Sequence, residues 1–340
     1  MIGSIPRDVL GRPLRDLRLS VIEACNFRCP YCMPADMIDD DHGLDAASRL
    51  SFDEIETLVR GFVQLGVRKL RLTGGEPLLR KRLPELVRRL TAIDGIEDLA
   101  LTTNGSLLAV RAQALRDAGL RRVTVSLDTL NPGLFLQLSG GRGDLAGVLA
   151  GIAAAKAAGF APIKLNCVVQ RDINDGGILD LAAYAREHGH VLRFIEYMDV
   201  GTCNGWSRER VVPSIEIRDR LHARWPLQSL DPNYRGEVAS RHAYVDGAGE
   251  VGFVSSVSAP FCGDCHRARV SADGQLYTCL FAGNGHALRP LLVQGEDALA
   301  SHVAGLWEQR ADRYSETRRI EAGSEAGASR RHVEMFLVGG

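Results

Sequence analysis

Six strand-like runs, separated by segments of helical character, recur along this chain. The runs begin at residues 15, 69, 98, 122, 162 and 191, and in each of them apolar residues alternate with polar ones. A period of two is typical of β-strands, and strands that alternate with helices favour a parallel sheet. Because eight strands close a complete βα barrel, six predict an α/β fold with an open parallel sheet or an incomplete (βα)6 barrel.

The segment after residue 50 illustrates the helices expected between the strands. Ser51 and Glu54 form the S-x-x-E pattern of a capping box, and Gly66 is a typical residue to end a helix. The apolar positions between them recur at helical spacing: Ile55, Leu58, Val59 and Phe62. We therefore expect an amphipathic helix that begins after Ser51 and stops at Gly66.

The second face of the predicted strands is polar, although a closed parallel barrel is normally filled by branched apolar side chains. Four of these polar positions carry cations: Arg18, Arg71, Lys164 and Arg193. Such a face predicts a cavity that holds a polyanionic ligand, such as a triphosphate. The alternative is that the four cations pair with neighbouring carboxylates such as Glu76 or Glu196, since unpaired buried charges are costly.

The composition and net charge indicate in which cellular compartment the protein works and which classes of partner it binds. The chain has 340 residues, of which 45% are hydrophobic, so it can build its own core without disulfides. Its first residues contain no apolar signal core, and no apolar run reaches about 18 residues. We expect a soluble, cytoplasmic protein with reduced thiols. Its net charge of -1 argues against a nucleic-acid or membrane partner.

Three cysteines, which we call the first triad, follow the first predicted strand: Cys25, Cys29 and Cys32, in the run CNFRCPYC. They are one ligand short of a tetrahedral site, so zinc with a distant fourth ligand is one interpretation, and a four-iron cluster with one open iron is another. With Tyr31 before the last cysteine, the spacing resembles the signature of the radical S-adenosylmethionine enzymes. The run TGGEP at residues 73–77 resembles the same superfamily's turn for the methionine amino group.

A second triad of cysteines occurs about 230 residues later: Cys262, Cys265 and Cys279. The turn signal Asp273-Gly274 predicts a hairpin that folds Cys279 back toward Cys265. From spacing alone, a zinc site completed by His266 or His286 is an alternative to an iron–sulfur cluster. Arg267 and Arg269 have the spacing that places two side chains on one side of a strand, which suggests an anionic substrate beside the metal.

The whole set of motifs closely resembles the molybdenum cofactor biosynthesis protein A family of radical S-adenosylmethionine enzymes. The resemblance runs from about Gly11 to Gly340. It rests on the two triads, GGEP, LTTNG, VSLD, RFIEYMDVG, CHRARVSADG and the terminal Gly339-Gly340. It implies an incomplete (βα)6 barrel of the radical S-adenosylmethionine type over residues 10–235, and a C-terminal domain over residues 236–340 that carries a second cluster.

The resemblance also implies a role for each matching residue. The first triad would hold the 4Fe-4S cluster that binds S-adenosylmethionine, and the second triad a 4Fe-4S cluster whose open iron binds the guanine of GTP. Contacts to S-adenosylmethionine are expected from Tyr31, Gly75, Ser126 and Met198. Contacts to GTP are expected from Arg18, Arg71, Thr102, Lys164, Arg193, Arg267, Ala268 and Arg269. The catalytic residues implied are Arg18, Arg267, Arg269, Gly339 and Gly340.

The activity that the resemblance implies is the radical conversion of GTP to (8S)-3',8-cyclo-7,8-dihydroguanosine 5'-triphosphate, the first step of molybdenum cofactor biosynthesis. It further implies an external electron donor of flavodoxin or ferredoxin type, a homodimer, and cyclic pyranopterin monophosphate synthase as the next enzyme. The alternatives are another radical S-adenosylmethionine enzyme with an auxiliary cluster, and a zinc-binding protein without enzymatic activity.

Several features lie outside these motifs. Cys167 falls in an apolar strand and is expected to be a small core residue, whereas Cys203 has no assigned role. Residues 34–49 are rich in aspartate and small residues and are expected to form a mobile loop. Glu23-Ala24 precedes the first triad, where many members of the family carry arginine.

Overall fold

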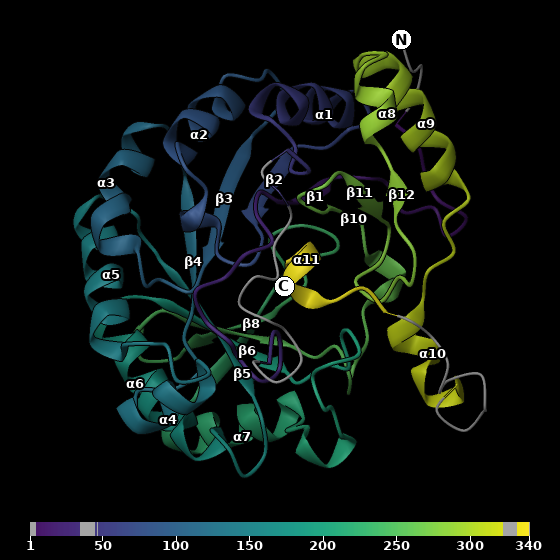
Figure 1. Ribbon diagram of the computed structural model, residues 1–340. Helices are drawn as coiled ribbons and strands as arrows, with labels where there is room; N and C mark the ends of the chain where they lie inside the picture. Colours follow the sequence, from purple (N-terminus) through teal and green to yellow (C-terminus); the bar gives the residue numbers. More distant parts are fainter. Residues whose placement is uncertain (1–4, 35–44, 46, 322–331, 340) are drawn as a thin grey trace.

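The computed structural model describes residues 5–34, 45, 47–321 and 332–339, and its central feature is a set of six parallel strands surrounded by helices (Figure 1). The strands are β1 (Asp16–Ser20), β2 (Lys69–Thr73), β3 (Asp98–Thr103), β4 (Arg122–Ser126), β5 (Lys164–Val169) and β6 (Val191–Glu196). They are hydrogen-bonded in chain order, each parallel to the next. All six predicted strands are confirmed, and each begins within two residues of its predicted run.

Helices connect these strands and cover the outside of the sheet. They are α1 (Phe52–Gln64), α2 (Leu83–Thr91), α3 (Leu108–Asp117), α4 (Pro132–Leu138), α5 (Leu145–Ala157) and α6 (Ile178–His188). Helix α1 begins with the predicted capping box: the Glu54 amide donates to Ser51 Oγ at 3.2 Å, and the Ser51 amide donates to Glu54 Oε2 at 2.7 Å. It ends before Gly66, whose φ of +100° suits glycine. The predicted helix is confirmed.

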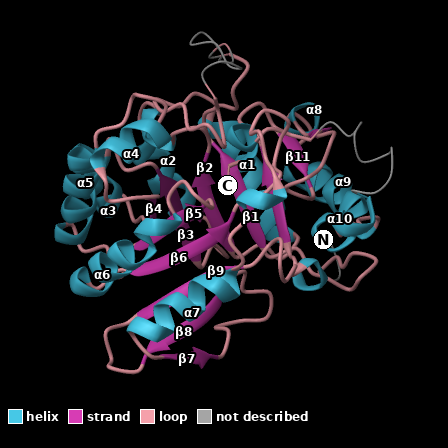
Figure 2. Cartoon of the chain, turned by 90° about the horizontal axis from the view of Figure 1, so that it is seen from below, coloured by secondary structure: helices cyan, strands magenta, loops and turns pink. Residues whose placement is uncertain are grey.

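Strands from the C-terminal third extend the sheet at both edges. They are β7 (Leu227–Leu230), β8 (Ser240–Tyr244), β9 (Glu250–Val254), β10 (Arg267–Val270), β11 (Gln275–Tyr277) and β12 (His286–Ala287). Strand β10 pairs in parallel with β1, and β9 pairs in parallel with β6. Figure 2 shows β7 and β8, with helix α7 (Ser214–Arg224), to one side of the other strands. The sheet has two separate ends, β12 and β7, so the predicted incomplete barrel is confirmed.

The two faces of the parallel strands differ as predicted. Leu17 and Leu19 of β1 are buried in the apolar core between the sheet and the outer helices. Arg18, between them, points to the inner side and lines a cavity. Cys167 of β5 is also buried in the core, at 1% exposure, which confirms its predicted place.

The predicted hairpin after Arg269 is confirmed. Strands β10 and β11 are antiparallel, and Gly274 between them has a φ of +86°. Helices α8 (Arg289–Leu292), α9 (Glu296–Glu308), α10 (Tyr314–Glu321) and α11 (Met335–Val338) follow. Because β9 and β10 pair directly with β6 and β1, one sheet spans residue 235, and the division at this residue stays a prediction. Among the described residues, no helix has the length and apolar character needed to cross a membrane.

A buried ion network, which we call the Asp8 clamp, joins the N-terminal segment to the end of α9. It consists of Asp8, Arg12 and Arg310, whose side chains are at most 2% exposed. Asp8 Oδ2 lies 2.5 Å from Arg12 Nε and 3.1 Å from Arg310 Nη1. Arg12 Nη1 also donates to the Cys262 carbonyl at 2.6 Å, and Arg310 Nη1 to the Cys265 carbonyl at 2.8 Å. One carboxylate therefore pairs with two cations that hold the backbone of the second triad, and Asp312 is a second partner of Arg310.

We predict that Asp8→Asn lowers the free energy of unfolding by about 3–5 kcal/mol, because it removes the carboxylate that pairs with buried Arg12 and leaves Arg310 with Asp312 alone. The matched control is Asp219→Asn, which breaks an ion pair with Arg218 whose side chains are 62% and 40% exposed. It should change the free energy of unfolding by less than about 0.5 kcal/mol. Urea unfolding followed by circular dichroism measures both, and equal effects of the two variants would contradict the prediction.

Candidate active site

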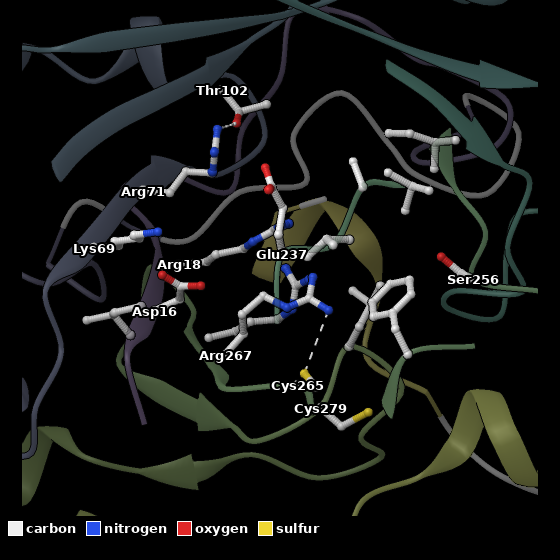
Figure 3. A pocket seen from close by; sticks show the side chains of 18 of the residues that line it. Asp16, Arg18, Lys69, Arg71, Thr102, Glu237, Ser256, Cys265, Arg267 and Cys279 are labelled. Carbon is white, nitrogen blue, oxygen red and sulfur yellow. Dashed lines mark hydrogen bonds between the residues drawn. The ribbon is translucent and has the colours of Figure 1, made fainter. Parts of the chain in front are cut away.

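The inner face of the parallel strands, together with the second triad, surrounds a cavity of about 440 Å³. Figure 3 shows side chains from several strands directed toward it. Nine basic side chains line it, against four acidic ones. The basic residues are Arg18, Lys69, Arg71, Arg122, Lys164, Arg193, Arg267, Arg269 and Arg310. All four inner-face cations predicted from the alternation are among them, so the predicted cationic cavity is present.

Strand register places three of these arginines side by side. Arg18 is paired with Arg269 of β10 on one side and with Arg71 of β2 on the other. Burial lowers the pKa of Arg71 to about 10 and that of Arg269 to about 9. Burial, and then the charges of neighbouring arginines, also lower the pKa of Arg18. Arg71 is oriented by hydrogen bonds from its Nη1 to Thr102 Oγ1 at 2.9 Å and Thr124 Oγ1 at 3.1 Å.

Lys164 and Arg193, on β5 and β6, extend this positive region along the sheet. Burial lowers the pKa of Lys164 to about 7, and the charges of Arg193, Arg122 and Arg71 add to the effect. Arg122 differs from these residues because it pairs with Asp98. The cavity therefore contains cations whose mutual repulsion a bound anion would relieve.

The glutamates proposed as alternative partners of these cations accept hydrogen bonds from other groups. Both Glu76 and Glu196 have 0% exposure. Glu76 accepts hydrogen bonds from the Thr103 hydroxyl and from the amides of Leu78 and Asn104. Glu196 accepts from the amides of Ser214, Val257 and Ser258 and from the Ser258 hydroxyl. The alternative in which these glutamates pair with the inner-face cations is wrong.

The second triad lies at the wall of the same cavity. Arg267 Nη2 donates to Cys265 Sγ at 3.7 Å, as Figure 3 shows. Burial acts to raise the pKa of the Cys265 thiol, but the positive charges of Arg267 and Arg310 lower it to about 6. For the Cys279 thiol, burial dominates and raises the pKa to about 11.

The histidines considered as zinc ligands face other partners. His266 Nδ1 lies 3.2 Å from Asp16 Oδ2, and His266 Nε2 is hydrogen-bonded to the Arg235 carbonyl at 2.9 Å. His286 is exposed on β12. Within the described part of the chain, no three Cys, His, Asp or Glu side chains have the arrangement of a site for a single metal ion.

The first triad is presented by the loop that follows β1. The amides of Cys32 and Met33 donate to the Cys29 carbonyl at 2.9 and 2.8 Å, and the Phe27 amide donates to Cys25 Sγ at 3.4 Å. Burial, and to a smaller extent the nearby Glu76 carboxylate, raise the pKa of the Cys25 thiol to about 11. All three cysteines are partly buried.

The TGGEP turn packs directly against the residues that precede the first triad. The Gly75 amide donates to the Ile22 carbonyl at 2.8 Å. A Cβ on Gly75 would lie 2.3 Å from the Ala24 carbonyl oxygen, and one on Gly74 would lie 2.1 Å from the Ile22 carbonyl oxygen. Glycine is therefore required at both positions by this close approach of two backbones.

The residues predicted to contact S-adenosylmethionine follow the carboxyl ends of four strands: Tyr31 after β1, Gly75 after β2, Ser126 at the end of β4 and Met198 after β6. In parallel sheets this edge is where ligands bind. The Tyr31 hydroxyl donates to Asp128 Oδ2 at 2.6 Å, and Asp128 Oδ1 accepts from the Val168 amide at 2.8 Å. Asp128 thereby fixes the Tyr31 ring beside the first triad.

The C-terminal residues 332–339, which we call the tail, end at Arg269, a residue that lines the cavity. Arg269 Nη1 donates to the carbonyls of Val338, at 3.3 Å, and Gly339. Figure 1 shows α11 and the chain end at the centre of the ring of strands. Gly340, also predicted to be catalytic, lies outside the described residues, as do residues 35–44 and 46 of the predicted loop over residues 34–49.

Sequence reasoning missed several residues of the cavity and assigned one whose side chain lies elsewhere. Lys69, Tyr234 and Glu237 line the cavity, and Lys69 Nζ lies 3.0 Å from the centre of the Tyr234 ring. The alternation in the second predicted run could have identified Lys69, two residues before Arg71. Ala268 has 0% exposure and its side chain packs in the core, so its predicted contact to GTP could involve its backbone alone.

The donor sets suit iron–sulfur clusters. Each triad consists of three thiols from one short segment or hairpin, and thiolates are the ligands that iron–sulfur clusters prefer. At the second triad, Arg267 and Arg310 already favour the ionised form of Cys265. The residues present therefore fit clusters with three protein ligands.

Comparison with known proteins identifies the family. The Radical SAM superfamily model matches residues 19–185, and the Molybdenum Cofactor Synthesis C model matches residues 190–316. The chain is 68% identical to a GTP 3',8-cyclase of Xanthomonas campestris pv. campestris (strain 8004), covering 98% of this chain and 97% of the relative. It is 41% identical to that of Staphylococcus aureus (strain MRSA252), covering 98% of each chain.

Solved structures support the fold. Streptococcus suis SuiB bound to precursor peptide SuiA is 13% identical, with a TM-score of 0.61 over 90% of this chain and 66% of that chain. At this identity the similarity concerns the fold alone. Together with the two cysteine triads and the cationic cavity, the full-length matches show that this chain belongs to the GTP 3',8-cyclase family of radical S-adenosylmethionine enzymes.

Proposed function

We propose that this chain converts GTP to (8S)-3',8-cyclo-7,8-dihydroguanosine 5'-triphosphate, the first step of molybdenum cofactor biosynthesis. The observation that carries the proposal is the row of Arg269, Arg18 and Arg71 in the same cavity as the second triad. Joining ribose to base within one nucleotide requires that both ends of the nucleotide be held. The cavity offers cations for the triphosphate and a metal-ligating triad for the base.

The triphosphate would bind the cations that have no carboxylate partner in the described part of the chain. Arg71, Lys164 and Arg193 come from three different strands and all line the cavity. Guanidinium groups bind phosphate oxygens through paired hydrogen bonds, and Thr102 already holds Arg71 in a fixed orientation. Burial lowers the pKa of these groups and repulsion between the cations adds to the effect, so a bound polyanion would be favoured by charge.

The first triad would hold a 4Fe-4S cluster, and S-adenosylmethionine on it would contact Tyr31, Gly75, Ser126 and Met198, which follow the carboxyl ends of four strands. The chemistry that bound S-adenosylmethionine supplies is a 5'-deoxyadenosyl radical for hydrogen abstraction at the ribose C3'. The part played by this chain is to position the ribose and to exclude water, because such a radical reacts with most C–H bonds.

The second triad would hold a second 4Fe-4S cluster that binds the guanine. Arg267 and Arg269 project from β10 beside this triad and would orient the nucleotide between base and phosphates. The Asp8 clamp supports this role because it holds the carbonyls of Cys262 and Cys265 in fixed positions.

The tail would assist the radical step from its position at Arg269. Gly339 adopts a φ of +67°, and a Cβ there would lie 2.1 Å from Thr73 Oγ1, so glycine is required. We propose that Gly339, together with the following Gly340, assists the radical step at the ribose. This function for the pair depends on the family relationship.

The remaining parts of the proposal concern partners. The chain needs an external one-electron donor of flavodoxin or ferredoxin type, since reduction of the first cluster requires an electron from outside. The cyclised product would pass to cyclic pyranopterin monophosphate synthase. A homodimer and a cytoplasmic location stay predictions.

The proposal predicts two clusters and one cyclised product. After anaerobic reconstitution we expect about eight irons per chain, and turnover with GTP, S-adenosylmethionine and dithionite should yield 5'-deoxyadenosine and the cyclised nucleotide. The matched control is Cys262→Ser, which should retain about four irons and form 5'-deoxyadenosine without cyclised product. Bound zinc without iron would support the zinc-binding alternative. Cleavage of S-adenosylmethionine with no cyclised nucleotide from the two-cluster wild type would support a different radical enzyme.

We predict that Lys164 makes GTP binding depend on pH. Free Lys164, with a pKa of about 7, loses its proton as the pH rises through neutrality, whereas bound triphosphate holds the ammonium charged. Binding therefore takes up a proton, and affinity should fall by up to about tenfold per pH unit above about pH 7. Lys164→Arg keeps its charge and should remove this part of the decline, while the ionisation of GTP itself is common to both proteins. Calorimetric Kd values that rise in parallel for the two proteins across this range would refute the prediction.

A further inference from the structure

The tail connects the surroundings of the two triads. Phe336 packs on Met33 in a cluster that Cys25 and Cys32 border. Val338 packs on Tyr277, at the end of the strand that precedes Cys279. Helix α11 has four residues, and an isolated helix of this length is unstable in water. The position of the tail must therefore be fixed by contacts to the rest of the protein.

Glu334 makes the polar contacts that meet this need. It occupies the residue before α11, but its side chain does not cap the helix. Its Oε1 accepts hydrogen bonds from the Thr202 amide at 2.8 Å and from Thr202 Oγ1 at 2.6 Å. Cys203 Sγ donates to Glu334 Oε2 at 2.9 Å. One carboxylate thus receives three hydrogen bonds from the loop that follows β6.

Gly201 makes room for this carboxylate. Its φ is +76°, and a Cβ at this position would lie 2.1 Å from Glu334 Oε2. Glycine is required here by its backbone conformation and by the approach of the Glu334 side chain. Four residues later, Gly205 has a φ of +59° and no atom within 4 Å of its would-be Cβ.

The loop that receives Glu334 also carries Met198. Asn204 Nδ2 donates to the carbonyls of Met198 at 3.0 Å and Val200 at 2.9 Å. Trp206 Nε1 donates to the Tyr197 carbonyl at 2.9 Å. The residue expected to contact S-adenosylmethionine and the residues that bind the tail therefore belong to one internally bonded loop.

We propose that Glu334 and residues 201–203 form a latch that seats the tail at the active site, so that Glu334 is a positioning residue for the radical step. The inference rests on the proposed function in one respect, because the tail matters to chemistry if this chain cyclises GTP. When the latch is closed, the carbonyl of Gly339 stays at Arg269, which lines the cavity. When it is open, radicals should form but react without cyclising the nucleotide.

Two measurements on the reconstituted holoenzyme test the latch. The first is hydrogen–deuterium exchange at the amides of Val333, Leu337 and Gly339, which donate to carbonyls in this structure. The second is the ratio of 5'-deoxyadenosine to cyclised nucleotide during turnover. Glu334→Ala and Gly201→Ala should each accelerate exchange in the tail by about tenfold or more and raise the ratio by about fivefold or more.

Two further variants separate the latch from a general loss of structure. Gly205→Ala strains the same loop through a similar backbone conformation but does not approach Glu334, so its exchange and product ratio should match the wild type. Glu334→Gln keeps an acceptor for Thr202 and should give values between those of the wild type and Glu334→Ala.

The outcomes are distinguishable. Tail exchange that is unchanged in both Glu334→Ala and Gly201→Ala would overturn the latch. Faster exchange with an unchanged product ratio would overturn the positioning role. Absence of cyclised nucleotide from the wild type would instead refute the proposed function, while the exchange rates would still decide whether Glu334 holds the tail.

Discussion

Positive charge in excess inside the sheet, with no ion pair to Arg18, Arg71 or Arg269 among the described residues, is the constraint on which the active site depends. The register of β10, β1 and β2 brings Arg269, Arg18 and Arg71 side by side, and their burial lowers the pKa of each. Such an arrangement is unfavourable in an empty protein. It becomes favourable once a polyanion is bound. The unliganded protein is less stable as a result, but its binding site is preorganised.

Other buried arginines of this protein form ion pairs. Arg12 and Arg310 share the carboxylate of Asp8, and each also donates to a backbone carbonyl of the second triad. Paired cations are structural here and unpaired ones are left for the ligand. Arginines that pair with Asp8 stabilise the fold around the second triad, whereas Arg269, Arg18 and Arg71 are available to bind an anion.

Much of the fold and part of the site could be predicted because their signals are local. A period of two identified all six parallel strands and the inner-face cations, and the S-x-x-E pattern identified the start of α1. The hairpin at Gly274 carried its own turn signal. No local sequence signal indicated that β9 pairs with β6 or that β10 pairs with β1, because strand partners far apart in sequence leave no local pattern.

The sequence by itself determined which residue types reach the inner face and which cysteines can act together, since side-chain direction along a strand and ligand spacing follow from chain geometry alone. Tertiary structure decided which charges remain unpaired. It assigned Glu76 and Glu196 to backbone amides, Asp8 to two arginines, and Glu334 to the loop that carries Cys203. Each of these partnerships joins segments far apart along the chain, and only folding brings such groups within hydrogen-bonding distance.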